Sequence, residues 1–245
     1  MIPLSDELTT VRTPWMTYAI LAAMLLTWIF VQGAGFNQQA LAASVCNLGM
    51  VPGELTHMAP LGEAVPLGRG IACVIDNDPI NVLTPFISMF LHGGWGHILG
   101  NALFFWVFGN NIEDRKGWWR FLLLYLVGGA VATASQVLID PNSTVPIIGA
   151  SGAIAAVMGA YLVCYPKARI KSMIFFGPIL LRKVTAAWLL ILWFVLQFQY
   201  VISDAGIAWG AHVGGFTFGA LVGLWWRLRE RRSTPSAATP VPVPA

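Results

Sequence analysis

The sequence predicts an all-α membrane protein, a bundle of six transmembrane helices. Two observations concern composition: 57% of the 245 residues are hydrophobic, and only 10% are charged. Soluble domains carry roughly 25% charged residues, so this composition argues against an ordinary water-soluble domain. The third observation is a set of six apolar stretches without Asp or Glu. Each is long enough to cross about 30 Å of hydrocarbon as a helix.

The apolar stretches divide the chain. They cover residues 15–31, 93–109, 118–138, 147–165, 184–202 and 205–228. Two shorter apolar runs contain a proline and are too short to cross: 172–181 is expected at the membrane interface, and 81–91 in a re-entrant or surface-lying loop. We therefore expect a cytoplasmic N-terminal segment (1–14), a six-span domain (15–228) and a disordered cytoplasmic tail (229–245), which is rich in Pro and Ala.

The basic residues predict the orientation, because Lys and Arg concentrate in cytoplasmic loops. Six crossings place 13 of the 14 on one side and only Arg69 on the other. Both termini are then cytoplasmic, and the long loop 37–91 is external. Asp6 and Glu7 precede the first stretch, which favours an uncleaved helix over a secretory signal. In a bacterium the expected location is the inner membrane.

Composition also limits the partners. A net charge of +3 without a single basic patch argues against nucleic-acid binding, so the expected partners are the lipid bilayer and transmembrane proteins; the oligomeric state stays open. Three cysteines exclude a disulfide scaffold and a Cys-based zinc cluster, and we expect no cofactor or metal. Cys46 and Cys73 share the external loop, where a disulfide is chemically possible, but their pairing stays open. Cys164 is expected to be a packing residue.

Four polar side chains inside the stretches are candidates for function, because such residues are costly in a membrane. Measured from the outer ends of their stretches, His97 lies about 6 Å deep, Asn101 about 12 Å, Ser151 about 6 Å and His212 about 10 Å. They can therefore meet in one layer. Gln197 and Gln199 lie near the outer end of the fifth stretch, where we expect interfacial hydrogen bonds.

Ser151 and His212 suggest a nucleophile and its base. Ser151 stands at a predicted helix start, either as an N-cap or as a nucleophile beside free backbone N–H groups. His212 is either a buried structural histidine or the base that such a serine needs. Gly215 and Gly219 share the face of His212, and Gly152 offers a small partner, so the two helices can approach closely. Without an intramembrane carboxylate, the sequence predicts a dyad rather than a triad.

His97 and Asn101 are four residues apart and therefore share a helix face. Two neutral donors level with Ser151 suit an oxyanion, and the alternative is interhelical hydrogen bonding alone. His92, at the junction of loop and helix, is expected to anchor the loop. His57, in the external loop, is expected to be exposed.

Three motifs resemble the rhomboid family of intramembrane serine proteases: H-G-G-W-G-H-I-L-G-N at 92–101, G-A-S-G at 149–152 and A-H-V-G-G at 211–215. The resemblance extends over about residues 80–225. It implies that Ser151 is the nucleophile and His212 the base. It further implies an oxyanion hole made of His97, Asn101 and the backbone N–H of Ser151, with Gly149 supporting the site. Members cleave transmembrane segments near their outer ends.

The chain departs from the family pattern at two places. Some members carry an aromatic residue where this chain has Ala155, and some carry a Trp-Arg pair that its first loop lacks. The alternative function is a catalytically silent rhomboid-like protein that binds membrane clients. Such proteins typically lack the serine or the histidine, whereas Ser151 and His212 are both present. A transporter is disfavoured because the stretches lack carboxylates, and a missing His-Glu-x-x-His motif excludes a zinc protease.

Overall fold

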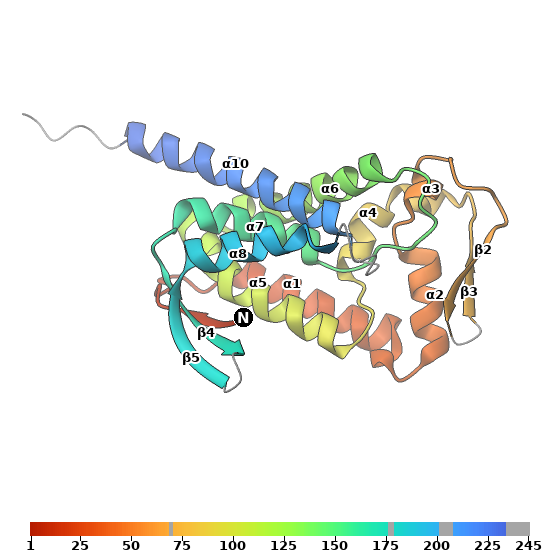
Figure 1. The fold of residues 1–245 in the computed structure, drawn as a ribbon, viewed down its shortest axis with the longest axis horizontal. Helices are drawn as coiled ribbons and strands as arrows, with labels where there is room; N and C mark the ends of the chain where they lie inside the picture. The colour runs from red at the N-terminus through yellow and green to blue at the C-terminus, as the bar shows by residue number, and fades with distance from the viewer. Residues whose placement is uncertain (69–70, 176–178, 201–207, 234–245) are drawn as a thin grey trace, which may run out of the picture.

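Each predicted apolar stretch contains a helix in the computed structural model, which describes residues 1–68, 71–175, 179–200 and 208–233. These helices run along the long axis of the molecule (Figure 1). They are α1 (Trp15–Leu26, continued by the π-helix η1, Thr27–Val31), α5 (Trp95–Lys116), α6 (Trp118–Ile139), α7 (Ser151–Cys164), α8 (Ala186–Gln197) and α10 (Trp209–Ser233).

One of the described helices, Trp118–Ile139, is both long and apolar enough to cross a membrane by itself. The segments Trp15–Val31, Ser151–Cys164 and Ala186–Gln197 are apolar but shorter. The helical fold agrees with the predicted class of membrane protein, whereas the number of six crossings stays a prediction.

Some helix ends differ from the apolar stretches. α7 begins at Ser151 rather than at residue 147, because Ile147 forms an isolated β-bridge with Met50 and the chain turns at Gly149 with φ +117°. α10 continues to Ser233, so its last turn includes residues assigned to the tail from the sequence. Residues 205–207 of the sixth stretch and 234–245 of the tail lie outside the described residues.

Two small β-sheets correct the prediction of a purely helical fold. One is antiparallel, in the order β1 (Ile2–Asp6), β4 (Arg169–Phe175), β5 (Ile179–Thr185), and the other is the hairpin of β2 (Ala64–Gly68) and β3 (Ile71–Val74). The run 172–181 thus belongs largely to two strands. Burial alternates along β4, since Ile170 and Ser172 are buried while Arg169 and Lys171 are exposed.

The loop 37–91 is folded. It contains short helices and turns: α2 (Gln38–Leu48), α3 (Pro52–Leu55), η3 (Pro79–Val82), α4 (Thr84–Ile87) and η4 (Ser88–Phe90), after the turn η2 (Gly33–Gly35). A disulfide joins Cys46 in α2 to Cys73 in β3, which answers the question of their pairing. The run 81–91 forms only short helical turns, and His57 is exposed as expected.

α7 lies at the centre of the molecule, and Gly152–Tyr161 are all buried. Its backbone lies close to that of α10 at several glycines, among them Gly159 and Gly219. A Cβ atom at Gly219 would lie 1.8 Å from the carbonyl oxygen of Ala156, and one at Gly159 would lie 2.0 Å from that of Phe216. The small residues therefore allow the close approach of α7 and α10 that the sequence predicts.

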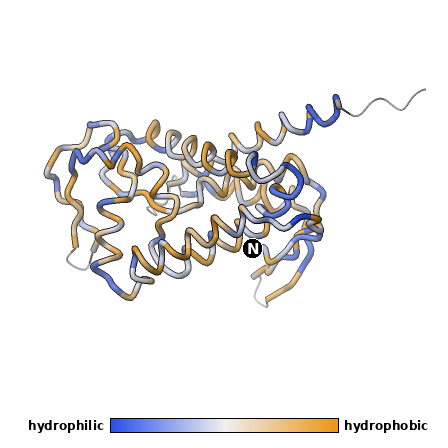
Figure 2. Tube along the Cα trace, turned by 180° about the vertical axis from the view of Figure 1, so that it is seen from behind, coloured by the Kyte–Doolittle hydropathy of each residue, from blue (hydrophilic) through white to orange (hydrophobic). Residues whose placement is uncertain are grey.

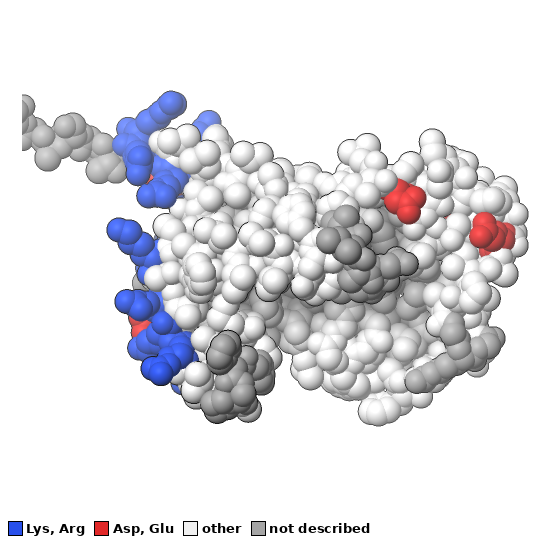
Figure 3. Space-filling model, in the orientation of Figure 1, with Lys and Arg blue, Asp and Glu red and all other residues white. Residues whose placement is uncertain are grey.

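Charge and hydropathy are distributed along the long axis. Hydrophobic residues predominate along the helices, and hydrophilic residues are more frequent towards both ends of the molecule (Figure 2). On the face seen in Figure 3, Lys and Arg gather at the end where β5 and the end of α10 lie, and acidic side chains stand out at the opposite end. This separation gives the bundle two chemically different ends.

Candidate active site

Ser151 is the first residue of α7, and the residue before it, Ala150, occupies the N-cap position. The chain enters the helix through Gly149, whose positive φ is easily adopted only by glycine. The simpler alternative, in which Ser151 is the N-cap, does not match this geometry. The Ser151 hydroxyl is free for another partner.

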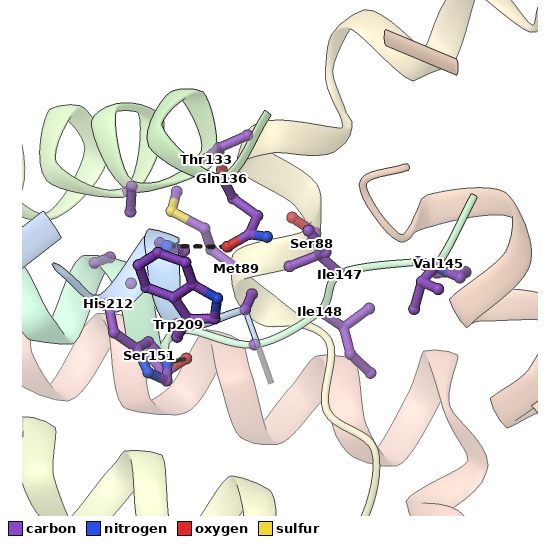
Figure 4. Close-up of a pocket in the computed structure, with 18 of the residues that line it drawn as sticks. Ser88, Met89, Thr133, Gln136, Val145, Ile147, Ile148, Ser151, Trp209 and His212 are labelled. Carbon is purple, nitrogen blue, oxygen red and sulfur yellow. Dashed lines mark hydrogen bonds between the residues drawn. The ribbon is translucent and has the colours of Figure 1, made fainter. Parts of the chain in front are cut away.

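That partner is His212 of α10. Ser151 Oγ and His212 Nε2 are 2.8 Å apart, and both residues lie at one side of a pocket (Figure 4). Close packing of α7 and α10 brings them together, since a Cβ atom at Gly215 would lie 2.2 Å from the carbonyl oxygen of Gly152. The two helices thus present a serine and a histidine within hydrogen-bond distance.

Gln197 at the end of α8 contacts the other ring nitrogen of His212. Gln197 Oε1 lies 2.7 Å from His212 Nδ1, and the side chain is only 4% exposed. The expectation of an interfacial hydrogen bond was therefore wrong for Gln197, although Gln199 is exposed. A position near the outer end of the fifth stretch predicts an interfacial role, yet Ser151 and His212 are predicted at a similar depth. Depth was the signal that could have identified Gln197.

An aromatic ring packs beside His212, but it comes from a different helix than the family pattern suggests. Trp193 of α8 has its ring centroid 5.7 Å from that of His212, at an interplanar angle of 45°. Ala155, where some rhomboids carry an aromatic residue, is fully buried in α7. In this chain α8 therefore contacts His212 through both Trp193 and Gln197.

His97 and Asn101 of α5 approach the turn before Ser151. A Cβ atom at Gly149 would lie 2.6 Å from His97 Nε2 and 3.6 Å from Asn101 Nδ2, so only glycine fits there. The backbone N–H of Gly93 donates to His97 Nδ1 at 3.2 Å, which leaves the proton of a neutral ring on Nε2. Both side chains thus direct an N–H group towards the site.

The environment of Asn101 argues against the alternative in which His97 and Asn101 only form hydrogen bonds between helices. Its side chain is buried, and among the described residues nothing accepts a hydrogen bond from Nδ2. A residue whose role was to join helices would have its donor paired across the interface. A buried, unpaired donor costs free energy, which favours a role in holding a group that enters the pocket.

His92 has the anchoring environment expected from the sequence. Its backbone N–H donates to Gln32 Oε1 at 2.8 Å, and Gln32 Nε2 donates to its carbonyl oxygen at 2.9 Å. Its ring meets the ring of His97 edge-on, with centroids 5.1 Å apart. Burial, followed by the neighbouring His97, lowers the pKa of His92 to about 4. His92 is therefore neutral at physiological pH.

The pocket has a volume of about 770 Å³ and includes all four polar residues singled out in the apolar stretches: His97, Asn101, Ser151 and His212. Figure 4 shows Thr133 and Gln136 of α6 on another side of it. Gln136 Oε1 accepts a hydrogen bond from the backbone N–H of Ala211 at 3.3 Å. No group of three or more His, Cys, Asp or Glu side chains in the described parts of the chain is placed to hold a metal ion.

Comparison with known proteins identifies the family. A family model described as "Rhomboid domain" matches residues 80–229, more than half of the chain. RHOMBOID-like protein 5 of Arabidopsis thaliana is 27% identical over 227 residues, covering 89% of this chain and 69% of that protein. Rhomboid protease GluP of Bacillus subtilis (strain 168) is 31% identical over 145 residues, covering 58% and 26%. Rhomboid protein 1, mitochondrial, of Saccharomyces cerevisiae (strain ATCC 204508 / S288c) is 29% identical over 161 residues, covering 59% and 43%.

The matched region contains the whole pocket site, from His92 to Gly219. This chain spans about two thirds of the Arabidopsis protein but less than half of the other two relatives. Some relatives are proteases by name. The chain belongs to the rhomboid family.

Proposed function

We propose that the protein is an intramembrane serine endopeptidase that cleaves transmembrane segments of other membrane proteins near the external face. The observation that carries this proposal is the 2.8 Å contact between Ser151 Oγ and His212 Nε2. A serine becomes a useful nucleophile only when an adjacent base takes its proton, and His212 is in position to do so.

The first step forms an acyl-enzyme. Ser151 Oγ attacks the carbonyl carbon of the scissile peptide bond, and its proton passes to His212 Nε2. Negative charge then develops on the carbonyl oxygen. His97 Nε2–H and Asn101 Nδ2–H can donate to that oxygen, together with the backbone N–H of Ser151, because the first N–H groups of a helix lack intrahelical partners. His212 returns the proton to the leaving nitrogen as the C–N bond breaks.

The second step hydrolyses the ester on Ser151. A water molecule attacks the acyl carbon and gives a proton to His212 Nε2, which passes it to Ser151 Oγ as the C–O bond breaks. The products are a new carboxylate and the regenerated serine. The pocket of about 770 Å³, lined in part by polar side chains such as Thr133 and Gln136, supplies room for water beside Ser151.

The place of Ser151 along the bundle supports cleavage near the external face. α7 begins at Ser151, and its other end lies about 20 Å away by helical rise. There Arg227 donates to the carbonyl oxygen of Val163 at 3.3 Å, close to the basic end of the molecule (Figure 3). We propose that this basic end is cytoplasmic, that both termini lie there and that six helices cross the bilayer, which puts Ser151 towards the outside.

The test uses purified protein reconstituted in liposomes with single-span model substrates. Ser151→Ala and His212→Ala should each lower cleavage by roughly 10³-fold or more, and the double variant should be little worse, because the two residues act as a unit. Ser135→Ala is the matched control. It removes a hydroxyl of α6 that donates to the carbonyl oxygen of Val131, so it should cleave normally.

Labelling with a fluorophosphonate gives a second readout. The wild type should react and Ser151→Ala should not. Substantial cleavage by folded Ser151→Ala would overturn the proposed nucleophile. Substrate that binds to the wild type and stays intact, with no labelling, would instead support the silent client-binding protein.

A further inference from the structure

Gln197 has a polar side chain at the end of an otherwise apolar helix, α8. It is the last residue of α8 and 4% exposed, while the residues on either side, Leu196 and Phe198, are 44% and 45% exposed. Its amide therefore points into the bundle, where an unpaired polar group is costly. Both ends of the amide need partners, and those partners determine what Gln197 does.

The two partners fix the direction of the amide. Gln197 Nε2 donates to the carbonyl oxygen of Trp193 at 2.8 Å, and a carbonyl oxygen can only accept. The amide NH₂ must therefore face Trp193, which turns Oε1 towards His212 Nδ1 at 2.7 Å. Because Oε1 is also only an acceptor, Nδ1 must carry the proton.

This arrangement decides which tautomer of His212 is present. With the proton on Nδ1, the neutral ring has its lone pair on Nε2, and Nε2 faces Ser151 Oγ at 2.8 Å. That is the tautomer required of a base. The hydrogen bonds form a continuous chain from the Ser151 hydroxyl through His212 and Gln197 to the Trp193 carbonyl. Such chains polarise their members cooperatively.

We propose that Gln197 is the positioning residue of the site, so that Ser151, His212 and Gln197 form a hydrogen-bonded triad in place of an isolated dyad. The inference rests on the proposed protease function and deepens it. Gln197 occupies the position that a carboxylate holds in Ser-His-Asp triads. Its amide oxygen accepts from Nδ1–H throughout the reaction, and the bond strengthens when the ring becomes charged. A neutral amide avoids burying an anion in the membrane.

The decisive variant is Gln197→Leu, which keeps a similar volume and removes the acceptor. It should lower kcat roughly 10- to 1000-fold, because the ring can then rotate or adopt the other tautomer. KM should change little, since Gln197 touches His212 rather than the substrate. Gln199→Leu is the matched control. It makes the same change two residues away at an exposed position and should leave kcat unchanged.

The pH profile separates positioning from packing. Gln197→Glu keeps an acceptor facing Nδ1, so it should be far more active than Gln197→Leu. A carboxylate there favours the protonated ring, so the acid limb of kcat/KM should move by about one pH unit or more to higher pH. A structural role alone would lower the thermal midpoint without moving that limb.

Each result either supports or overturns the positioning role proposed for Gln197. Folded Gln197→Leu with the kcat and pH profile of the wild type overturns it. If Gln197→Leu does not fold, an unmoved acid limb in Gln197→Glu overturns it instead. Failure of the protease proposal would look different, because the wild type would then leave substrates intact. If the wild type leaves substrates intact but still reacts with the fluorophosphonate, the rate of labelling at Ser151 should fall in Gln197→Leu but not in Gln199→Leu. A wild type that neither cleaves nor reacts overturns both proposals.

Discussion

At the scale of single residues, the proposed oxyanion hole depends on the buried side-chain donor of Asn101. Its amide nitrogen is buried and unpaired among the described residues, which costs on the order of 1–3 kcal/mol. His97, one turn earlier on the same helix, has its ring oriented by the backbone N–H of Gly93. The two donors are thus held in place near Gly149 before any substrate arrives. Preorganisation of this kind is most valuable where charge develops only in the transition state.

Asn101→Ala should therefore reduce rate without reducing stability. We expect cleavage to slow by roughly one to three orders of magnitude, while binding of an uncleaved transmembrane substrate changes far less. The thermal midpoint should stay unchanged or rise, because an unsatisfied buried donor has been removed. Rate per folded molecule and thermal stability are measured on the same samples.

Asn110→Ala, further along α5, is the control and should cleave at the normal rate. Normal turnover by folded Asn101→Ala would remove Asn101 from the oxyanion hole.

At the scale of elements, the site depends on how closely α7 and α10 pack. Ser151 begins one helix and His212 lies in the first turn of the other, so their contact depends on the distance between two backbones. Gly219 controls that distance, because its Cα faces the backbone of Ala156. The backbone of Ala156 cannot move aside as a flexible side chain can. A methyl group at residue 219 must therefore separate the helices.

Gly219→Ala should lower both stability and activity. Overpacking of this kind costs roughly 1–3 kcal/mol, and lengthening the Ser151–His212 contact should slow cleavage even in the folded fraction. Thermal unfolding and fluorophosphonate labelling measure the two effects.

Gly100→Ala is the control variant, since a Cβ atom at residue 100 would have no neighbour within 4 Å among the described residues. It should be neutral or slightly stabilising, because alanine favours the helix. Equal stability of the two variants would contradict the packing argument.

At the scale of the whole molecule, two independent features indicate the same orientation. Lys and Arg gather at one end of the molecule (Figure 3), and basic ends face the cytoplasm. The Cys46–Cys73 disulfide lies in the loop 37–91, and disulfides persist on the oxidising side of a membrane. Together these features predict that the loop is external and the end of α10 cytoplasmic.

Thiol labelling in intact cells tests this orientation. A membrane-impermeant maleimide should label Cys46 and Cys73 only after reduction, because the disulfide blocks both thiols. Arg232→Cys, at the end of α10, should react only after the membrane is permeabilised. Both measurements use a Cys164→Ala background. Labelling of residue 232 from outside would invert the topology and place Ser151 near the cytoplasmic face.

The sequence by itself was sufficient for features that depend on local patterns. Apolar length predicted where the long helices lie, because a chain segment in lipid must satisfy its own backbone. Polar residues in those stretches identified Ser151, His212, His97 and Asn101 as candidates. Small residues on the face of His212 indicated a close helix pair. Each of these signals is contained within one stretch of chain.

Only the tertiary structure decided features that join distant segments. The sheet pairs Ile2–Asp6 with β4 (Arg169–Phe175), although no local pattern specifies that partner. The ring beside His212 comes from Trp193 rather than from α7. Gln197 looks interfacial in its own stretch, and only the packing of α8 beside α10 shows that its side chain contacts His212. Periodicity determines which face of an element is apolar, but the partner of a side chain is determined by which elements pack together.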